Sequence, residues 1–143
     1  MAFFKGLSDV LKAIPEGLES AIEITVQETV AQLDSDLKEG SPVDSGRFRA
    51  SWFQAQARGG EPSTGRVAPE VEKGQKVPAP PKLEAGSLDG LANHIVVNNL
   101  PYAERICEAG WSKKVNEDWY KRIAQKWETG KYLEEALKEN IDL

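Results

Sequence analysis

Apolar residues recur at helical spacing through the first third of the chain. The first such series occupies residues 7–18, and Pro15 lies near its end, before the next series begins at Ile22. Because proline lacks an amide hydrogen and its ring clashes with the preceding turn, it should kink or split the helix. The pattern predicts a long helix from about residue 7 to 37, which Gly40 ends. One face of its second part carries Ile22, Val26, Val30, Leu33 and Leu37.

Two shorter patterns predict strands. Apolar and polar side chains alternate from Arg47 through Trp52, which is typical of a half-buried strand, and this strand should continue to about Arg58. The alternative is one helical turn over residues 47–51, with the strand starting near Trp52. A β-branched run bounded by asparagines at residues 93–99 predicts a second strand. We expect the two strands to pair in an antiparallel sheet.

Glycine and proline interrupt the chain repeatedly from Gly59 to Gly90. A segment of this length without regular structure is uncommon inside a compact domain and is usually functional or disordered. We interpret residues 59–90 as an extended arm that becomes ordered only against a neighbouring molecule.

Helical patterns return after the second strand. Residues 100–103 should lead into a short helix that ends near Gly110, and Asn116 is a suitable N-cap for a further helix. Thr129 and Gly130 should interrupt that helix before a last short one. The whole pattern predicts a single α+β domain over residues 1–143, in which N-terminal and C-terminal helices pack on one side of a small antiparallel sheet.

Charge is distributed unevenly along the 143 residues, whose formal net charge is −5. Residues 45–82 contain seven basic and three acidic side chains, whereas residues 1–44 contain three basic and nine acidic ones. A basic middle between acidic flanks allows copies of the chain to associate head to tail. The overall acidity argues against a nucleic-acid binder. No apolar run reaches a membrane-spanning length, and the start of the chain does not resemble a secretory signal, so we expect synthesis in the cytoplasm and no membrane partner.

Candidate chemistry is sparse. One cysteine, Cys107, and one histidine, His94, are too few for a Cys/His zinc site within one chain. A nucleophile paired with a base would also need an orienting group and oxyanion donors, and the sequence marks neither. Adjacent carboxylates fall on predicted helix faces, where solvation explains them. We therefore expect no catalytic residues, no metal site and no cofactor.

Turn chemistry is concentrated at residues 41–52. Pro42 favours an extended path for the residue before it, and Asp44 is suited to accept hydrogen bonds from the following backbone amides. Gly46 can adopt a positive φ without steric strain. We refer to residues 41–52 as the corner and expect it to redirect the chain.

Arginine and tryptophan side chains are candidates for a protein interface, where both are enriched. Arg47 and Arg49 suit an anionic group on a partner, or alternatively a salt bridge to the acidic first helix. Trp111, in a loop, is the best tryptophan candidate, whereas Trp119 and Trp127 fit packing against the sheet.

Two segments resemble the neck and tail-completion proteins of tailed bacteriophages. The corner, Ser-Pro-Val-Asp-Ser-Gly-Arg-Phe-Arg-Ala-Ser-Trp, is similar to that family's P-V-D-T-G-x-L-R-x-S signature, with Ser45 where threonine is commoner. Residues 98–112 are similar to its N-x-x-P-Y-A…E-x-G segment, with Ala109 where an aromatic residue is common. The order of elements is also similar, over about residues 15–130.

The resemblance implies a non-enzymatic virion protein located at the head–tail junction. Such a protein forms a homo-oligomeric ring, a hexamer or dodecamer, which joins the head connector to the tail, and genomic DNA passes through its lumen without specific binding. Its partners are other neck proteins, the tail terminator or the tail tube. On this basis the interface should include Asp44, Gly46, Arg47, Arg49, Trp52, Tyr102 and Trp111.

Three alternatives remain open from the sequence. A tail terminator ring would instead cap the end of the tail tube. A small hydrolase or nuclease would use the carboxylates. An acidic adaptor acting in the host would be monomeric or dimeric and absent from particles.

Overall fold

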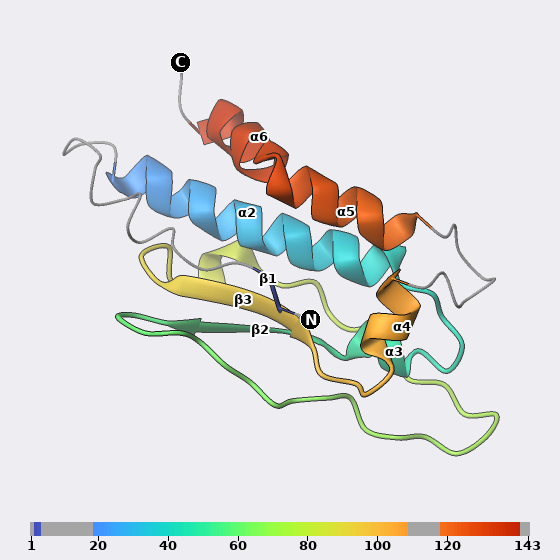
Figure 1. The fold of residues 1–143 in the computed structure, drawn as a ribbon. Helices are drawn as coiled ribbons and strands as arrows, with labels where there is room; N and C mark the ends of the chain where they lie inside the picture. Colours follow the sequence, from blue (N-terminus) through green and yellow to red (C-terminus); the bar gives the residue numbers. More distant parts are fainter. Residues whose placement is uncertain (1, 4–18, 109–117, 141–143) are drawn as a thin grey trace.

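The computed structural model describes residues 2–3, 19–108 and 118–140, which form helices and a small antiparallel sheet in an α+β arrangement (Figure 1). Four predicted features lie outside the described residues: the apolar series at residues 7–18, the kink at Pro15, the N-cap at Asn116 and the interface candidate Trp111. The elements are β1 (Ala2–Phe3), α2 (Glu19–Gly40), α3 (Arg47–Ala50), β2 (Trp52–Ala57), the 3-10 turn η1 (Ala85–Ser87), β3 (Asn93–Asn98), α4 (Ala103–Glu108), α5 (Trp119–Glu128) and α6 (Lys131–Asn140).

The sheet has the strand order β1-β3-β2, with β3 paired antiparallel to both neighbours. Trp52 pairs with Asn98 at one end of the β2–β3 ladder, and Ala57 pairs with Asn93 at the other. This register confirms the predicted pairing of the two strands. Because side chains alternate between faces, Trp52 shares a face with Val96 and Asn98, and Phe53 shares the other with Val97.

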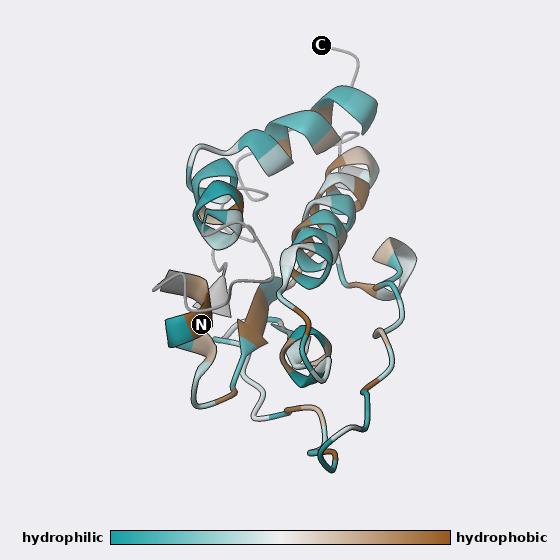
Figure 2. Cartoon of the chain, turned by 90° about the vertical axis from the view of Figure 1, so that its right-hand side faces the viewer, coloured by the Kyte–Doolittle hydropathy of each residue, from teal (hydrophilic) through white to brown (hydrophobic). Residues whose placement is uncertain are grey.

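The long helix α2 and the C-terminal helices α5 and α6 pack on one side of the sheet, as predicted. Figures 1 and 2 show α2 between the sheet and the pair α5–α6. Hydrophilic positions predominate on α6, which leads to the C-terminus in Figure 2. The Tyr132 hydroxyl donates to a carboxylate oxygen of Asp36 over 2.6 Å and ties α6 to α2. The core between the layers includes Val30, Leu33, Leu37, Phe48, Trp52, Val96, Leu100, Ile106 and Trp119.

Local signals place several element ends correctly. The helix α2 ends at Gly40, and β3 covers Asn93–Asn98, as the patterns predicted. The break between α5 and α6 falls at Thr129 and Gly130, where Gly130 adopts a φ of 75°. A left-handed glycine is a common way to end a helix, so this break follows from local sequence.

The predicted strand over residues 47–51 is wrong, and the alternative of a helical turn is confirmed. The turn α3 is closed by the Ala50 amide, which donates to the Gly46 carbonyl over 3.0 Å. The Ser51 hydroxyl also donates to the Arg47 carbonyl over 2.7 Å. The turn points Phe48 into the core, where its ring lies edge-on to Trp119. Packing against a distant helix therefore decides the local conformation.

The predicted arm packs against the rest of its own chain, without a neighbouring molecule. Its first half, residues 59–77, lies along the side of the sheet opposite the helices, as Figures 1 and 2 show. Side-chain amides of β3 and the residue after it hold it there. Asn93 donates to the Gly60 carbonyl over 3.1 Å, and Asn99 donates to the Thr64 carbonyl over 2.7 Å. The arm is thus a third layer of the same domain.

The second half of the arm returns to α2. The Gln27 side-chain amide donates to the Leu88 carbonyl over 2.7 Å. Gly90 lies so close to α2 that a Cβ atom built on it would be 2.5 Å from the Glu23 carbonyl oxygen. A glycine is required at this contact because two backbones approach each other directly.

We predict that Gly90→Ala destabilises the fold by about 1–3 kcal/mol, since the added methyl overlaps backbone that cannot yield easily. Gly86→Ala is the matched control, because nothing lies within 4 Å of the corresponding position. Urea unfolding followed by tryptophan fluorescence measures the difference. Equal unfolding midpoints for the two variants would contradict the close contact.

Candidate interaction site

The corner begins with a serine that links α2 to β2. The Ser41 hydroxyl donates to the Leu37 carbonyl over 2.5 Å and accepts a 2.9 Å hydrogen bond from the indole nitrogen of Trp52. Trp52 is 1% exposed, so its ring packs inside the fold rather than toward a partner. Ser41 therefore satisfies the one polar atom of the buried Trp52 side chain.

The next feature is the glycine of the corner. Gly46 is buried and has a φ of 92°. A Cβ atom at this position would lie 2.6 Å from the Val77 carbonyl oxygen, and the Val77 amide donates to the Ser45 carbonyl over 2.7 Å. The Ser45 hydroxyl accepts a hydrogen bond from the Arg47 amide over 3.2 Å, a turn bond of the kind that the sequence suggests for Asp44. Gly46 is thus the point at which the arm meets the corner.

Arg47 holds the arm to the corner. Its Nε donates to the Ala68 carbonyl over 2.9 Å, and its Nη1 lies 3.6 Å from a carboxylate oxygen of Glu70. The Ser51 hydroxyl accepts from the Ala68 amide over 3.0 Å, so one residue of the arm is bound through both of its backbone polar groups. Among the described residues, Arg47 thus pairs with the arm and not with the acidic first helix, which was one of the two alternatives left open by the sequence.

Arg49 differs from Arg47 although it lies one residue beyond Phe48 on the same turn. Its side chain is half-buried, and its Nε is buried without a hydrogen-bond partner. Its Nη2 lies 3.6 Å from the position that a Cβ on Gly46 would take. The guanidinium group is therefore beside the Gly46 turn, at the base of the arm.

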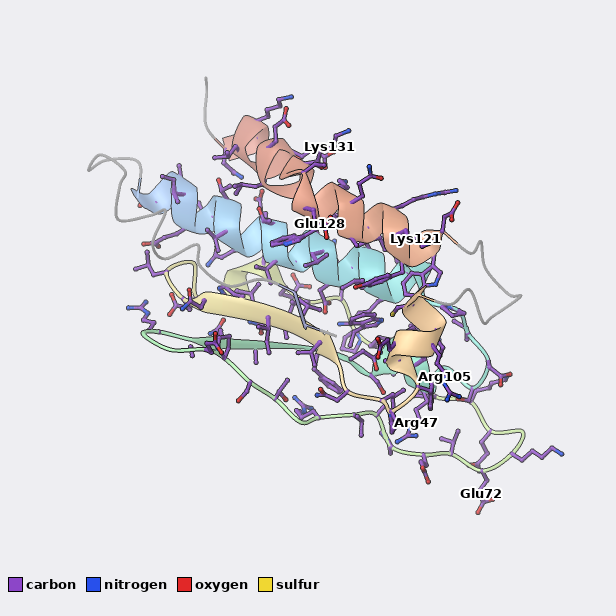
Figure 3. All side chains as sticks on the ribbon, viewed as in Figure 1. Arg47, Glu72, Arg105, Lys121, Glu128 and Lys131 are labelled. Atoms are coloured by element: carbon purple, nitrogen blue, oxygen red, sulfur yellow. The ribbon has the colours of Figure 1, made fainter. Side chains whose placement is uncertain are left out.

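Asp44 is the outermost candidate of the corner. Its side chain is exposed, and its carbonyl oxygen accepts a 2.6 Å hydrogen bond from Lys76 Nζ. Figure 3 shows Arg47 beside the arm and Glu72 at the arm's outer end. The corner and the arm therefore present polar groups together on one side of the molecule.

The structure brings the second resembling segment directly to the corner. The Asn98 side-chain amide donates to the Phe48 carbonyl over 3.0 Å, and its Oδ1 accepts from the Leu100 amide over 3.2 Å. Asn98 thus joins α3 to the turn that precedes α4. Tyr102 is half-buried and packs against the core cluster.

Sequence reasoning missed the polar residues that organise this site, namely Ser41, Ser51 and Asn98. Serine and asparagine next to turns often form hydrogen bonds with nearby backbone, so the sequence contained a partial indication of a role for these residues. The acceptors used here include the Phe48 carbonyl, which is distant in sequence from Asn98. Local pattern could not identify such partners.

The side chain of His94 is buried, and both of its ring nitrogens have hydrogen-bond partners. Its Nε2 lies 2.7 Å from the Asp89 carbonyl oxygen, which can only accept, so this nitrogen carries the proton. Its Nδ1 lies 2.9 Å from the Gln54 side-chain nitrogen and accepts from it. Burial lowers the pKa of His94, although the Asp89 carbonyl opposes this. The imidazole is therefore held neutral as a bridge between β2 and the end of the arm.

Other chemistry-bearing groups are dispersed in the described part of the chain. Cys107 is buried on α4 and forms no disulfide bond. Residues 2–3, 19–108 and 118–140 contain no group of three histidine, cysteine, aspartate or glutamate side chains placed to hold a metal ion. No helix in these ranges has the length and apolarity needed to cross a membrane.

Comparison of the chain with protein-family models, with curated proteins and with solved structures found no match. The site is therefore interpreted from its own geometry.

We predict that Gly46→Ala destabilises the protein more than Gly74→Ala does. Both glycines have nearly the same φ, 92° and 90°, so each substitution carries a left-handed penalty of about 1–2 kcal/mol. Only Gly46 faces a backbone atom, the Val77 oxygen, whereas nothing lies within 4 Å of Gly74. Chemical unfolding should show an additional loss of about 1–3 kcal/mol for Gly46→Ala. Equal losses would mean that the arm does not contact the corner.

We also predict that His94 makes stability depend on pH. Because its pKa is lower in the folded protein than the usual 6.5, the unfolded chain takes up the proton first. The contribution of neutral His94 to the free energy of unfolding is complete above about pH 6.5. It is lost as the pH falls through the lowered pKa of His94 in the folded protein.

The measurement is the unfolding free energy of the wild type and of His94→Leu between pH 8 and pH 5. Wild-type stability should fall more steeply below pH 6.5, by at most about 1.4 kcal/mol per pH unit. Burial raises the pKa of Asp34, despite the hydrogen bond and charge of Lys38, but this effect is common to both proteins and cancels in the difference. Parallel curves would contradict the neutral bridge.

Proposed function

We propose that the chain is a structural virion protein that assembles into a ring at the head–tail junction of a tailed bacteriophage and joins the head connector to the tail. The observation that carries this proposal is the contact between the two segments that resemble the neck and tail-completion family. Trp52 of the first segment pairs with Asn98 of the second, and Asn98 binds the Phe48 carbonyl. Segments far apart in the sequence thus form one structural unit, as expected if both define a common fold.

The distribution of charge supports assembly into a ring. Residues 45–82, which contain most of the corner and the first part of the arm, carry seven basic and three acidic side chains, whereas α2 contains six acidic residues and one basic residue. The arm lies on the side of the sheet opposite α5 and α6 (Figures 1 and 2). A ring requires a heterologous interface, in which one patch of a subunit meets a different patch of the next. Opposite charges on different faces favour such head-to-tail contacts. The net charge of −5 would also allow DNA to pass through the lumen without adhering.

We predict that the purified protein forms closed rings and that tailed particles from the organism carrying the gene contain it at the head–tail junction. Native mass spectrometry and electron microscopy give the copy number, and gold-labelled antibody gives the position. A chain that is monomeric under all conditions and absent from particles would refute the proposal. Labelling at the distal end of free tail tubes would indicate a terminator instead.

A pair of charge-reversal variants tests the surface used. Arg49→Glu should abolish ring assembly while the circular dichroism of the helices is retained; Arg47 is left unchanged because its side chain holds the arm to the corner. Lys121→Glu combined with Lys131→Glu is the matched control, because Figure 3 shows both lysines on the helices away from the corner. Loss of assembly in the control alone would place the interface on α5 and α6.

A further inference from the structure

The break between α5 and α6 forms a hollow on the surface of the molecule. The helix α5 ends at Glu128 and α6 begins at Lys131, and Gly130 between them has a φ of 75°. The hollow has a volume of about 450 Å³. The described side chains that line it are all polar, and they follow one stripe of α5 with its C-cap and one stripe of α6: Arg122, Gln125, Lys126, Thr129, Lys131 and Glu135.

Positive charge exceeds negative charge in this hollow. Three of the lining side chains are basic and one is acidic. Lys126 Nζ lies 2.9 Å from a carboxylate oxygen of Glu135, so these two charges compensate each other. Arg122 and Lys131 form no side-chain hydrogen bond or ion pair with the described residues. Two positive charges in the hollow are therefore uncompensated.

The Lys126–Glu135 ion pair gives the hollow a fixed wall. It joins α5 to α6 across the break, and Lys126 Nζ also lies 4.4 Å from the centre of the Tyr132 ring. Tyr132 is 2% exposed, and its hydroxyl donates to Asp36 of α2 over 2.6 Å. The wall is thus anchored to the body of the fold, whereas the exposed side chain of Arg122 can turn toward a ligand without unpacking the core.

We infer that this hollow binds a small, doubly charged oxyanion of the phosphate class between Arg122 and Lys131. The two uncompensated cations repel each other, and a dianion between them replaces this repulsion by attraction. A guanidinium group can donate two parallel hydrogen bonds to neighbouring phosphate oxygens, and an ammonium group supplies a compact charge. The exposed Gln125 amide offers a further donor from the same stripe of α5. This inference does not depend on the proposed ring.

A small phosphate fits the hollow better than a nucleic-acid strand does. A strand carries a negative charge at every nucleotide and needs a continuous basic surface. Figure 3 shows Glu128 on the same pair of helices as Lys121 and Lys131, and α5 and α6 together contain five basic and four acidic residues. The described lining also includes no aromatic side chain on which a base could stack.

The first test titrates the full-length protein with inorganic phosphate and replaces sodium chloride so that the ionic strength stays constant. Phosphorus NMR of the ligand reports binding at any oligomeric state of the protein. At about pH 7.5, where a phosphate group is mostly doubly charged, binding should saturate with a dissociation constant on the order of 1 mM. Absence of saturation by about 50 mM phosphate would overturn the inference.

Neutral variants of the two cations locate the site. Arg122→Gln and Lys131→Gln should each weaken phosphate binding about 5- to 10-fold, because each removes one charged contact at an exposed position. Lys121→Gln is the matched control, since this exposed lysine precedes Arg122 but does not line the hollow. It should change the affinity less than about twofold. Equal weakening in all three variants would mean that phosphate follows the general charge of α5, which contradicts a defined site.

A variant that strengthens binding excludes misfolding as the explanation. Glu135→Gln removes the negative charge of the hollow and releases Lys126, so phosphate affinity should rise about 3- to 5-fold. Glu134→Gln is the matched control, because Glu134 is exposed, pairs with Lys138 over 3.0 Å and does not line the hollow. Unchanged or weaker binding by Glu135→Gln would rule out an anion beside Lys126.

A last comparison separates free phosphate from the phosphates of a nucleic-acid backbone. Sulfate, a dianion of the same shape, should displace phosphate, whereas a short DNA duplex at equal ionic strength should not. Binding of the duplex that is lost in Arg122→Gln, without saturable binding of inorganic phosphate, would assign the hollow to nucleic acid and overturn the small anion.

Discussion

The fold depends on the burial of Trp52 with its indole hydrogen bonded to Ser41. This side chain begins β2, lies edge-on to Phe48 of α3, and reaches back to Ser41, the residue that follows α2. An indole of this size contributes several kcal/mol when buried, provided that its N–H has an acceptor. The three elements that converge on it fix the position of the corner, and the corner in turn fixes the arm.

The arm is held mostly by polar contacts to backbone rather than by an apolar core of its own. Carbonyls of Gly60, Thr64 and Ala68 accept from Asn93, Asn99 and Arg47 respectively. Such bonds fix direction and register without requiring regular structure in the arm. A segment rich in glycine and proline can therefore be ordered when the side chains of neighbouring elements supply the partners.

Much of the fold could be predicted from the sequence because its signals are local. The apolar stripe of α2, the glycine at its end and the β-branched run of β3 depend only on spacing and on residue type. The sequence alone could not decide whether residues 47–50, which form α3, are a strand or a helical turn. The alternation from Arg47 to Trp52 fits a strand as well as a helical turn, and the choice is made by contact between Phe48 and Trp119.

The site was predictable as a region but not in its details. The concentration of turn residues and arginines identified the corner, and the resemblance identified the segment that contacts it. Sequence could not separate Arg47 from Arg49, because the difference arises from the Ala68 carbonyl and the Glu70 carboxylate, which the arm brings back to the corner. The role of Ser51 as a link between turn and arm was hidden for the same reason.

The connection between β2 and β3 has a consequence for the order of folding. These strands are neighbours in the sheet, yet residues 58–92 separate them, so no tight hairpin can bring them together quickly. Closing so long a loop lowers the entropy of the chain before any ladder bond forms, and such non-local pairing slows the search for the native state. Helix α2 can form early, and the sheet must then assemble on it late, with the arm settling last.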